Sequence, residues 1–392
     1  MWILVIVALL LLAHVIMTWI LAIKRGGTAQ RRKARPIEYK IKADEGVTIL
    51  IPAWNECSTI RRCLESLVQQ TYVDWTAIIA AGGTDSTFQI AQDIARQDER
   101  LQVIEQTPIG KNGALADALA LARGDVIIVL DADSVVTPHW LATMLSSLGG
   151  EIAAVCGNYF PIRSTWVSET EQMEKVSSYM INHQVVLQGS GSIALNREAL
   201  LKSGSFPTGV SVGVDWDLDA RLKEAGFMCG FTPNAQVWTE RPSTLLEYWH
   251  NEVRWRRAHL AATWRHRIYY LDNLRLGLRE ISFYLVALAF AGSLITLVLG
   301  GLVWATTGWG ALIGLAILFL LWVAGRRAAI AMEVAAYENN WHLLRILYGP
   351  VVLMFVSLAA ALIAFSTPGR LPAHFQGPRD TSVWSKEQAT IV

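Results

Sequence analysis

Charged side chains are scarce in this sequence: Asp, Glu, Lys and Arg make up 17% of its 392 residues, against about 25% in soluble globular proteins. The 53% share of hydrophobic residues and the mean hydropathy of +0.32 favour membrane insertion and exclude general disorder. Cysteine is rare too: the sequence has only four cysteines, too few for a small secreted protein that is held together by disulfide bonds. A net charge of +1 gives no overall basic signature, so we expect no nucleic-acid partner.

Four long apolar stretches account for the shortage of charge. Trp2–Ile23 has no charged side chain, and a helix of that length rises about 33 Å, enough to cross the hydrocarbon core of a bilayer. A cleaved signal peptide is the alternative, but the apolar run is too long and no basic region precedes it. Three further predicted spans are Ile281–Val303, Ala305–Ala324 and Leu347–Phe365.

Basic residues predict the orientation of these spans. They cluster directly after the first span, before the second span, and between the third and fourth spans. By the positive-inside bias, all three segments lie in the cytosol, and the N-terminus and the C-terminal tail lie outside. We therefore predict a multi-pass protein of the cell membrane (plasma or inner) with a cytosolic middle domain, where four unpaired cysteines stay reduced.

The predicted organisation has six parts. They are a transmembrane helix at 1–23, a basic linker at 24–44, an α/β domain at 45–250, interfacial amphipathic helices at 251–280, three transmembrane helices at 281–366 with a cytosolic linker at 325–346, and a tail at 367–392.

The middle region alternates predicted strands and helices, which indicates a mostly parallel sheet. The strands are Val47–Ile51 (ended by Pro52), Thr76–Ala80, Leu101–Ile104 and Asp125–Leu130, and the helices are Asn55–Gln70 (with Ser58 as a possible cap), Thr87–Arg96 and Asn112–Ala122. Ligands of such sheets bind beyond the carboxyl ends of the strands. The residues after each strand are therefore the candidates for a site.

Two carboxylates follow the fourth predicted strand. Val126–Leu130 leads into Asp131-Ala132-Asp133, and carboxylate oxygens suit Mg²⁺ or Mn²⁺, which in turn bind a diphosphate. An Asp-x-Asp pair alone is a weak signal, because a solvated turn has the same composition. Its position at the end of a buried strand favours a cation site.

Two further groups have open interpretations. Asp215 and Asp217 precede a predicted helix, and either interact with its dipole or include a general base for an acceptor hydroxyl. Arg254 and Trp255 lie in a basic segment before the second span. Arg binds phosphate oxygens in bidentate fashion, but a basic amphipathic helix on anionic lipid has the same composition. We expect Arg254 to face the site and several neighbouring arginines to face lipid.

Other known motifs are absent or misplaced. Gly189-Ser-Gly191 opens a G-x-G-x-x-A sequence, but it lies too late in the chain for the first turn of a dinucleotide-binding fold, which disfavours a membrane dehydrogenase. Gly110-Lys111 lacks the upstream Gly and the following Ser or Thr of a P-loop. Cys and His residues show no zinc spacing, and no Gly-x-Ser-x-Gly elbow supports a hydrolase.

Seven short motifs in a fixed order resemble the membrane-integrated family 2 glycosyltransferases, which include cellulose, hyaluronan and poly-N-acetylglucosamine synthases and the ceramide and diacylglycerol glucosyltransferases. The resemblance covers about residues 47–257 and the layout of one N-terminal and several C-terminal spans. The motifs are Ile51-Pro-Ala-Trp-Asn-Glu56, Gly82-Gly-Thr-Asp85, Gly110-Lys-Asn-Gly-Ala-Leu115, Asp131-Ala-Asp133, Gly189-Ser-Gly191, Asp215-x-x-Leu218 and Arg254-Trp255.

The resemblance implies an α/β GT-A (Rossmann-like) domain, a nucleotide-sugar donor that is most often UDP-linked, Mg²⁺ or Mn²⁺, and inversion at the anomeric carbon. It implies Asp215 as the catalytic base and Asp133 with Asp131 as metal ligands. The donor-binding residues that it implies are Pro52, Asn55, Glu56, Gly83, Lys111, Asp131, Asp133, Arg254 and Trp255. The acceptor-binding residues that it implies are Gly189, Ser190, Gly191 and Trp216.

The sequence departs from the family pattern at three places. Ala80-Ala81 stands where the family often has an Asp that contacts the nucleobase, which leaves the base open. Val214 replaces the acid before the catalytic Asp, and Asn251 replaces a Gln. These departures give some weight to a non-enzymatic membrane receptor or scaffold with a degenerate transferase domain.

The resemblance and the spans together predict an inverting hexosyltransferase that moves a sugar to a lipid or lipid-linked acceptor among membrane lipids. A processive polysaccharide synthase is the alternative. Four spans make a wide single-subunit channel harder to build, so we slightly favour the lipid acceptor.

Overall fold

The computed structural model describes residues 2–33, 46–107, 110–181, 187, 191–207, 213–307 and 310–366. These residues divide into two compact units. A helical unit contains the long apolar helices, and a sheet unit contains the β-strands. The segment Thr165–Gln184 belongs to the helical unit, although in the sequence it lies inside the predicted domain 45–250. The sheet unit ends at Arg241, and the helical unit resumes at Pro242. The predicted boundary lies at residue 250.

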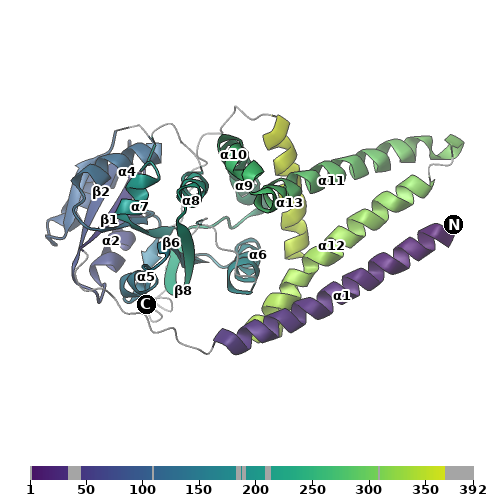
Figure 1. Ribbon diagram of the computed structural model, residues 1–392, viewed down its shortest axis with the longest axis horizontal. Coiled ribbons are helices and arrows are strands. Elements are labelled where there is room, and N and C mark those ends of the chain that lie inside the picture. Colours follow the sequence, from purple (N-terminus) through teal and green to yellow (C-terminus); the bar gives the residue numbers. More distant parts are fainter. Residues whose placement is uncertain are drawn as a thin grey trace. The chain divides into compact units, whose positions relative to one another are not determined.

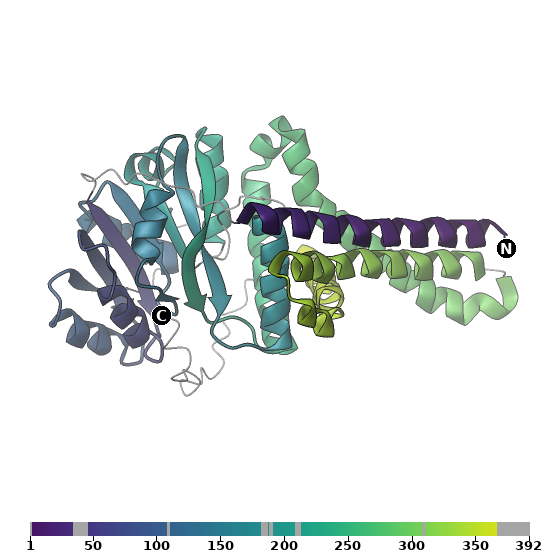
Figure 2. The ribbon, with the colours of Figure 1, turned by 90° about the horizontal axis from the view of Figure 1, so that it is seen from below.

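The described residues of the sheet unit form a mixed eight-stranded sheet in the order β3-β2-β1-β4-β7-β6-β8-β5 (Figures 1 and 2). The strands are β1 (Val47–Trp54), β2 (Trp75–Gly82), β3 (Leu101–Glu105), β4 (Val126–Leu130), β5 (Val135–Val136), β6 (Ile152–Pro161), β7 (Ser192–Asn196) and β8 (Met228–Thr239). The helices are α2 (Ile60–Val68), α3 (Thr87–Ala95), α4 (Gly110–Leu121), α5 (Trp140–Ser146), α7 (Arg197–Lys202) and α8 (Val214–Glu224).

The first four strands form the parallel core of the sheet. β1 pairs with β2 and β4, and β2 pairs with β3, all in parallel register. All five residues of β4 are buried, as is expected of a strand whose two faces are both covered. The α/β prediction is confirmed, and the four strands lie where the sequence places them to within a few residues.

Three predictions around β1 are wrong. Pro52 does not end the strand, because β1 runs on to Trp54. β4 pairs only with Val47–Leu50, so Pro52 lies where β1 has a single partner strand and a missing amide is tolerated. The following helix begins at Ile60 and not at Asn55, because Asn55 adopts a left-handed φ of 57° in a tight turn. Its N-cap is Thr59, not Ser58.

The helical unit contains helices long and apolar enough to cross a membrane. Among the described residues, three helical segments qualify as candidate membrane spans by length and composition: Val5–Gln30, Ile313–Glu338 and Gly349–Ser366. A shorter apolar helical segment covers Ile281–Leu297. The elements of the unit are α1 (Trp2–Lys33), α6 (Trp166–Lys175), the π-helix η1 (Val176–Ile181), α9 (Leu245–Arg265), α10 (Arg267–Asp272), α11 (Leu274–Thr307), α12 (Gly310–Glu338), the 3₁₀ helix η2 (Trp341–Ile346) and α13 (Gly349–Ser366).

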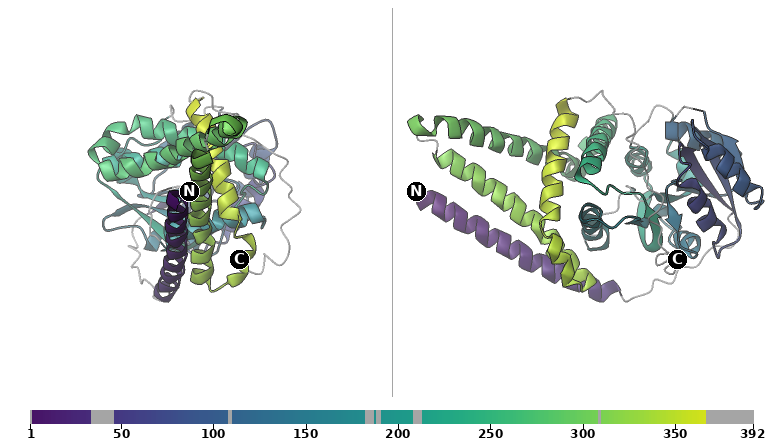
Figure 3. Two further views of the ribbon diagram at one scale, coloured as in Figure 1. Left: turned by 90° about the vertical axis from the view of Figure 1, so that its right-hand side faces the viewer. Right: turned by 180° about the vertical axis from the view of Figure 1, so that it is seen from behind.

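α1 and α12 lie side by side and run in the same direction (Figure 3). Trp19 Nε1 donates to the carbonyl of Gly325 at 2.6 Å, and Arg25 pairs with the buried Glu333 at 3.0 Å, two turns further along both helices. A Cβ at Gly26 would lie 2.1 Å from the carbonyl oxygen of Glu333. Glycine therefore permits the close approach of the two helices.

Helix boundaries in this unit differ from the predictions. α1 continues through the first residues of the predicted linker 24–44, and α12 continues through Arg326 and Arg327 into the predicted linker 325–346. Charged residues extend both helices because Arg25, Glu333 and Arg327 have partners within the unit. The predicted tail 367–392 lies outside the described residues.

Candidate active site

The turn Asp131-Ala132-Asp133 lies at the carboxyl end of β4, as predicted. The amide of Asp131 donates to the carbonyl of Gly191 at 2.9 Å, and the carbonyl of Asp131 accepts from the amide of Ser134 at 3.0 Å. Gly191 has a φ of 63°, and a Cβ there would lie 2.8 Å from Ser134 Oγ. The backbone that presents the two acids is therefore fixed on both sides before any ligand arrives.

Lys111 connects three of the predicted site acids. Its ammonium group, in the first turn of α4, forms an ion pair with Oδ1 of Asp131. Burial alone would lower the pKa of Lys111, but Asp131 and the charges of Asp215 and Asp133 outweigh burial and raise it. Lys111 thus contacts Asp131, and Asp133 and Asp215 lie near enough for their charges to act on it.

The first turn of α8 contains two acids with different surroundings. Asp217 is buried and forms an ion pair with Arg221 at 2.8 Å, while Arg221 also donates to the carbonyl of Ser203. Asp215 is partly exposed and lies close enough to raise the pKa of Lys111. Of the two candidates for a general base that the sequence leaves open, Asp215 is the more exposed and can be reached by an acceptor, whereas Asp217 is buried.

A second loop at the same edge surrounds Asn55 and Glu56. The amide of Thr84 donates to Asn55 Oδ1 at 2.7 Å, and Gly83 has a φ of 120° with no room for a Cβ, which would lie 2.2 Å from Asn55 Oδ1. Glu56 Oε2 accepts from the hydroxyl of Thr59 at 2.6 Å. The loop is thus built before a nucleotide binds, and Gly83 is required there by the packing of Asn55.

Asp85 links the two halves of this loop. Its carboxylate accepts from the amide of Cys57 at 3.1 Å and from the amide and hydroxyl of Thr87 at 3.0 and 2.6 Å. Burial raises the pKa of Asp85, but these hydrogen bonds outweigh burial and lower it. The ionised carboxylate therefore stabilises the folded loop.

We expect Asp85→Asn to lower the thermal unfolding temperature at pH 7. Because the folded pKa lies below the unfolded value of about 3.9, the stabilisation is present above that value and is lost as the pH falls through the folded pKa. The difference between wild type and variant should therefore shrink towards pH 3, which thermal unfolding of the detergent-purified protein measures. A constant difference from pH 7 to pH 3 would contradict this origin. Asp93→Asn, on the exposed side of α3, is the matched control.

The remaining predicted residues have different outcomes. Trp216 lies in α8 beside Asp215, and Pro52 lies near the end of β1. Arg254 and Trp255 lie in α9 of the helical unit, so their approach to the acids stays a prediction. Gly189 and Ser190 lie outside the described residues.

Sequence reasoning missed two residues that contact the acidic turn. Thr239 donates from Oγ1 to Asp133 Oδ1 at 3.2 Å, and the buried Cys63 thiol lies 3.7 Å from the carbonyl oxygen of Asp131. Burial, together with the charges of Asp133 and Asp131, raises the pKa of Cys63 well above its usual range and keeps it a neutral thiol. β8, which ends at Thr239, is not among the four strands that the sequence predicts, so no sequence signal pointed to Thr239.

The residues fit a divalent cation that is shared with a substrate. Among the described residues, no group of three or more His, Cys, Asp or Glu side chains is placed to hold a metal. Mg²⁺ and similar cations often bind through one or two carboxylates and complete their coordination with substrate phosphates and water. Asp131 and Asp133 supply two such carboxylates, and neither is fully buried.

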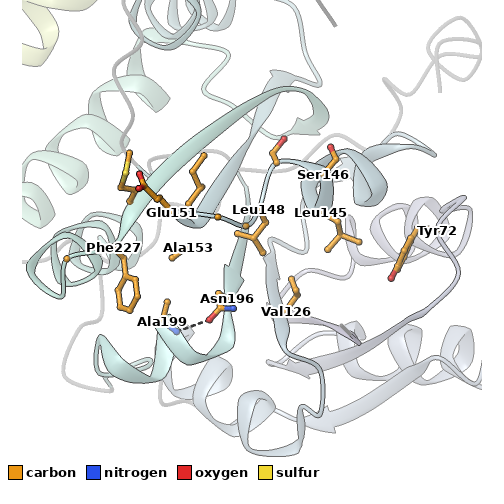
Figure 4. A pocket seen from close by; sticks show the side chains of 16 residues that line it. Tyr72, Val126, Leu145, Ser146, Leu148, Glu151, Ala153, Asn196, Ala199 and Phe227 are labelled. Carbon is orange, nitrogen blue, oxygen red and sulfur yellow. Dashed lines mark hydrogen bonds between the residues drawn. The ribbon is translucent and has the colours of Figure 1, made fainter. Parts of the chain in front are cut away.

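A groove of about 920 Å³ lies away from these acids (Figure 4). Val126, Ile152 and Met228, which line it, begin the strands β4, β6 and β8. These three strands run in the same direction, so the groove lies at the edge of the sheet opposite Asp131. Asn196, which also lines it, accepts from the amide of Ala199 as the cap of α7. The groove is thus separate from the candidate site.

Comparison with known proteins finds a family match over most of the sheet unit. Residues 48–205 match the family model described as glycosyl transferase family 2. The chain contains a family 2 glycosyltransferase domain. This chain is similar to the structure of the mannosyltransferase PcManGT from Pyrobaculum calidifontis in complex with GDP-Man and Mn²⁺. The similarity covers 86% of this chain and 98% of the PcManGT chain, with a TM-score of 0.58 and 20% identity. This likeness shows the fold, and the GT-A prediction for the family 2 domain is confirmed.

Curated relatives of the family 2 domain are longer than the matched region. Poly-beta-1,6-N-acetyl-D-glucosamine synthase of Staphylococcus aureus is 27% identical over 225 residues, which cover 54% of this chain and 54% of the relative. Chondroitin synthase of Escherichia coli is 28% identical over 208 residues, which cover 50% of this chain and 29% of the relative. This chain thus matches about half or less of the length of these relatives.

Proposed function

We propose that the protein is an inverting glycosyltransferase that moves a sugar from a nucleotide-sugar to a lipid or lipid-linked acceptor at a membrane. One observation carries the proposal: Asp131 and Asp133 follow β4 at the carboxyl edge of the sheet, where Lys111 forms an ion pair with Asp131 and is close enough to Asp215 for that charge to raise the pKa of Lys111. Ligands of open α/β sheets bind at this edge. In this proposal, Asp131 and Asp133 at the end of β4 form the cation site. Asp215, in the first turn of α8, is the base.

The proposed reaction divides its steps among these residues. Asp215 removes the proton from the acceptor hydroxyl as its oxygen attacks the anomeric carbon. The bond between that carbon and the diphosphate oxygen breaks, and the diphosphate leaves with the electron pair, so the configuration inverts. Lys111 stabilises the leaving diphosphate electrostatically. Asp131 and Asp133 would hold Mg²⁺ or Mn²⁺, which when bound supplies positive charge to the diphosphate.

The donor is proposed to be UDP-linked. Asn55, Glu56 and Gly83 form the prebuilt loop at the carboxyl end of β1, where a nucleoside would lie. Ala81 is buried and offers no polar side chain to a base, so recognition of the base falls to the backbone and to this loop. Complexes of fold neighbours with Mn²⁺, such as the PcManGT complex, support a divalent cation without distinguishing Mg²⁺ from Mn²⁺.

A panel of nucleotide-sugars tests this proposal. Detergent-purified protein is incubated with UDP- and GDP-linked hexoses, Mn²⁺ or Mg²⁺ and a membrane-lipid extract, and the released nucleoside diphosphate is measured. We expect release with at least one donor and none in the presence of EDTA. A chain that neither binds nor turns over any donor would contradict the proposal and would support the receptor or scaffold alternative.

A processive polysaccharide synthase is the second candidate, because two of the relatives are named as polymer synthases. The two candidates differ in their product. A single sugar on an extractable lipid supports the lipid acceptor, whereas a ladder of products that resist lipid extraction supports polymer synthesis. Size analysis of a radiolabelled product therefore distinguishes them.

The membrane surface is proposed to contact the region from α9 to the start of α11. Five large apolar side chains there are 55–72% exposed: Trp264, Ile268, Leu271, Leu274 and Leu278. Arg267 stacks on Trp264 with its guanidinium carbon 5.1 Å from the ring centroid. Apolar side chains among arginines are typical of helices that lie in the headgroup region. The same helices lead into α11, so an acceptor lipid would meet the protein here.

Spin labels at two exposed positions check this placement. We expect a label at Leu271→Cys, in a Cys57→Ser background and in reconstituted bilayers, to collide more with oxygen than with a water-soluble nickel chelate. A label at Glu65→Cys should show the reverse preference, because Glu65 is exposed on α2 of the sheet unit. Both measurements use continuous-wave EPR power saturation. A preference for the nickel chelate at both positions would contradict contact with the bilayer.

A further inference from the structure

We propose that Thr239 is a positioning residue for Asp133, which fixes the carboxylate in the orientation that binds the cation. This inference rests on the proposed function and deepens it, because it assigns a role to a residue outside every motif of the site. The side chain of Thr239 is buried, and its Oγ1 donates to Asp133 Oδ1 at 3.2 Å. A hydrogen bond to an ionised acceptor is stronger than one between neutral groups. Thr239 therefore restricts the rotamer of Asp133.

The sheet holds the two residues in register. β5 begins two residues after Asp133 and pairs with β8 in antiparallel register, with Val135 opposite Trp238. Continuing that register brings Ser134 opposite Thr239, so the acidic turn lies against the end of β8. Strand pairing thus anchors the turn within two residues of Asp133.

Contacts on either side of Thr239 make the end of β8 rigid. β6 pairs with β8 up to Thr239, which lies opposite Pro161. The carbonyl of Thr239 also accepts a hydrogen bond from the amide of Ile162 at 3.1 Å. The next residue, Glu240, forms an ion pair with Arg62 of α2 at 2.5 Å. Thr239 is thereby held by a neighbouring strand and by a helix that packs on the sheet. A hydroxyl on such a frame can orient a carboxylate with little loss of entropy.

Partners of this kind tune metal affinity without touching the metal. Groups that hydrogen-bond to a ligating carboxylate fix its orientation, and their removal typically weakens metal binding or activity by about 10–100-fold. If Thr239 were only a β-branched residue that fills the core, valine would replace it without effect on the cation. The two roles therefore predict different results for Thr239→Val.

Binding of Mn²⁺ measures the difference directly. The free Mn²⁺ signal in EPR is recorded during titration of the purified full chain at saturating UDP, and again with GDP. We expect Thr239→Val to raise the Kd for Mn²⁺ by about 10–100-fold and Thr239→Ser, which keeps the hydroxyl, to restore most of the affinity. In steady-state assays the apparent KM for Mn²⁺ should rise in Thr239→Val more than kcat falls. Thermal unfolding of each variant shows that it is folded.

Thr232→Val is the matched control. Thr232 lies in the same strand and is equally buried, but within the described part of the chain its hydroxyl has no hydrogen-bond partner. This control should bind Mn²⁺ like wild type. Asp133→Asn separates the two levels of the proposal. If it impairs Mn²⁺ binding while Thr239→Val binds like wild type, the role of Thr239 is refuted and the proposed function stands. If Asp133→Asn itself binds like wild type, the metal site and the role of Thr239 are both refuted.

Discussion

Asp215→Asn should reduce kcat by about 10²–10⁴-fold, the range that general base catalysis typically contributes. Asparagine has nearly the same shape as aspartate but cannot accept a proton at neutral pH, so donor binding should stay within a few-fold of wild type. Initial rates of nucleoside diphosphate release give kcat, and calorimetric titration with UDP gives donor affinity. Because Asp215 also raises the pKa of Lys111, the variant leaves Lys111 with one fewer acidic neighbour.

The neighbouring Asp217 supplies the control for this experiment. Asp217→Asn leaves the guanidinium of Arg221 without the charged partner that it has at 2.8 Å in α8. Loss of one member of a buried ion pair is strongly destabilising, so this variant should unfold at a lower temperature. A folded Asp215→Asn protein with normal turnover would refute the assignment of the base. The acceptor would then have to lose its proton to another group.

Asp133→Asn should abolish most of the metal-dependent donor binding. Loss of a partner that only orients a ligand costs about 10–100-fold in metal affinity, so loss of a charged ligand should cost at least about 100-fold. Titration of UDP with and without Mn²⁺ measures this effect, because binding without the cation should change little. The backbone of the turn is held by its bonds to Gly191 and Ser134, so the fold should survive the substitution.

Asp125→Asn is the matched control for Asp133. Asp125 precedes β4 at the opposite end of the same strand, and its side chain is exposed. We expect this variant to bind Mn²⁺ and UDP like wild type. If Asp133→Asn keeps the Mn²⁺-dependent gain in UDP affinity, the cation is not held at the Asp131–Asp133 turn.

Local signals were enough to predict the parallel core and the acids at its edge. The short length and β-branched residues of Val126–Leu130 favour a strand over a helix, and the strand end fixes the location of Asp131 and Asp133. The turn at Asn55 could not be predicted in the same way. Its left-handed φ is stabilised by contacts with Thr84 and Gly83, which lie in the loop after another strand, β2.

Contacts between distant parts of the sequence explain the other differences. Thr239 and Asp133 are separated by 106 positions and meet because β5 pairs with β8. The segment α6–η1 lies between two strands of the family 2 domain in sequence, yet Glu174 pairs with Arg327 of α12 and the Ser177 hydroxyl donates to Glu333. Such pairings depend on which helices meet in three dimensions. No local pattern of hydrophobic residues indicates them.

The common direction of α1 and α12 limits how the chain can be threaded. Two helices that cross a bilayer in the same direction must be separated in the sequence by a helix that crosses in the opposite direction. The long apolar helix α11, which precedes α12, is in the position to do this. If these helices traverse the bilayer, the Lys33 end of α1 and the Glu338 end of α12 open into the same compartment. Under the same condition, the sheet unit lies in that compartment too, because it follows α1 in the sequence and precedes α11.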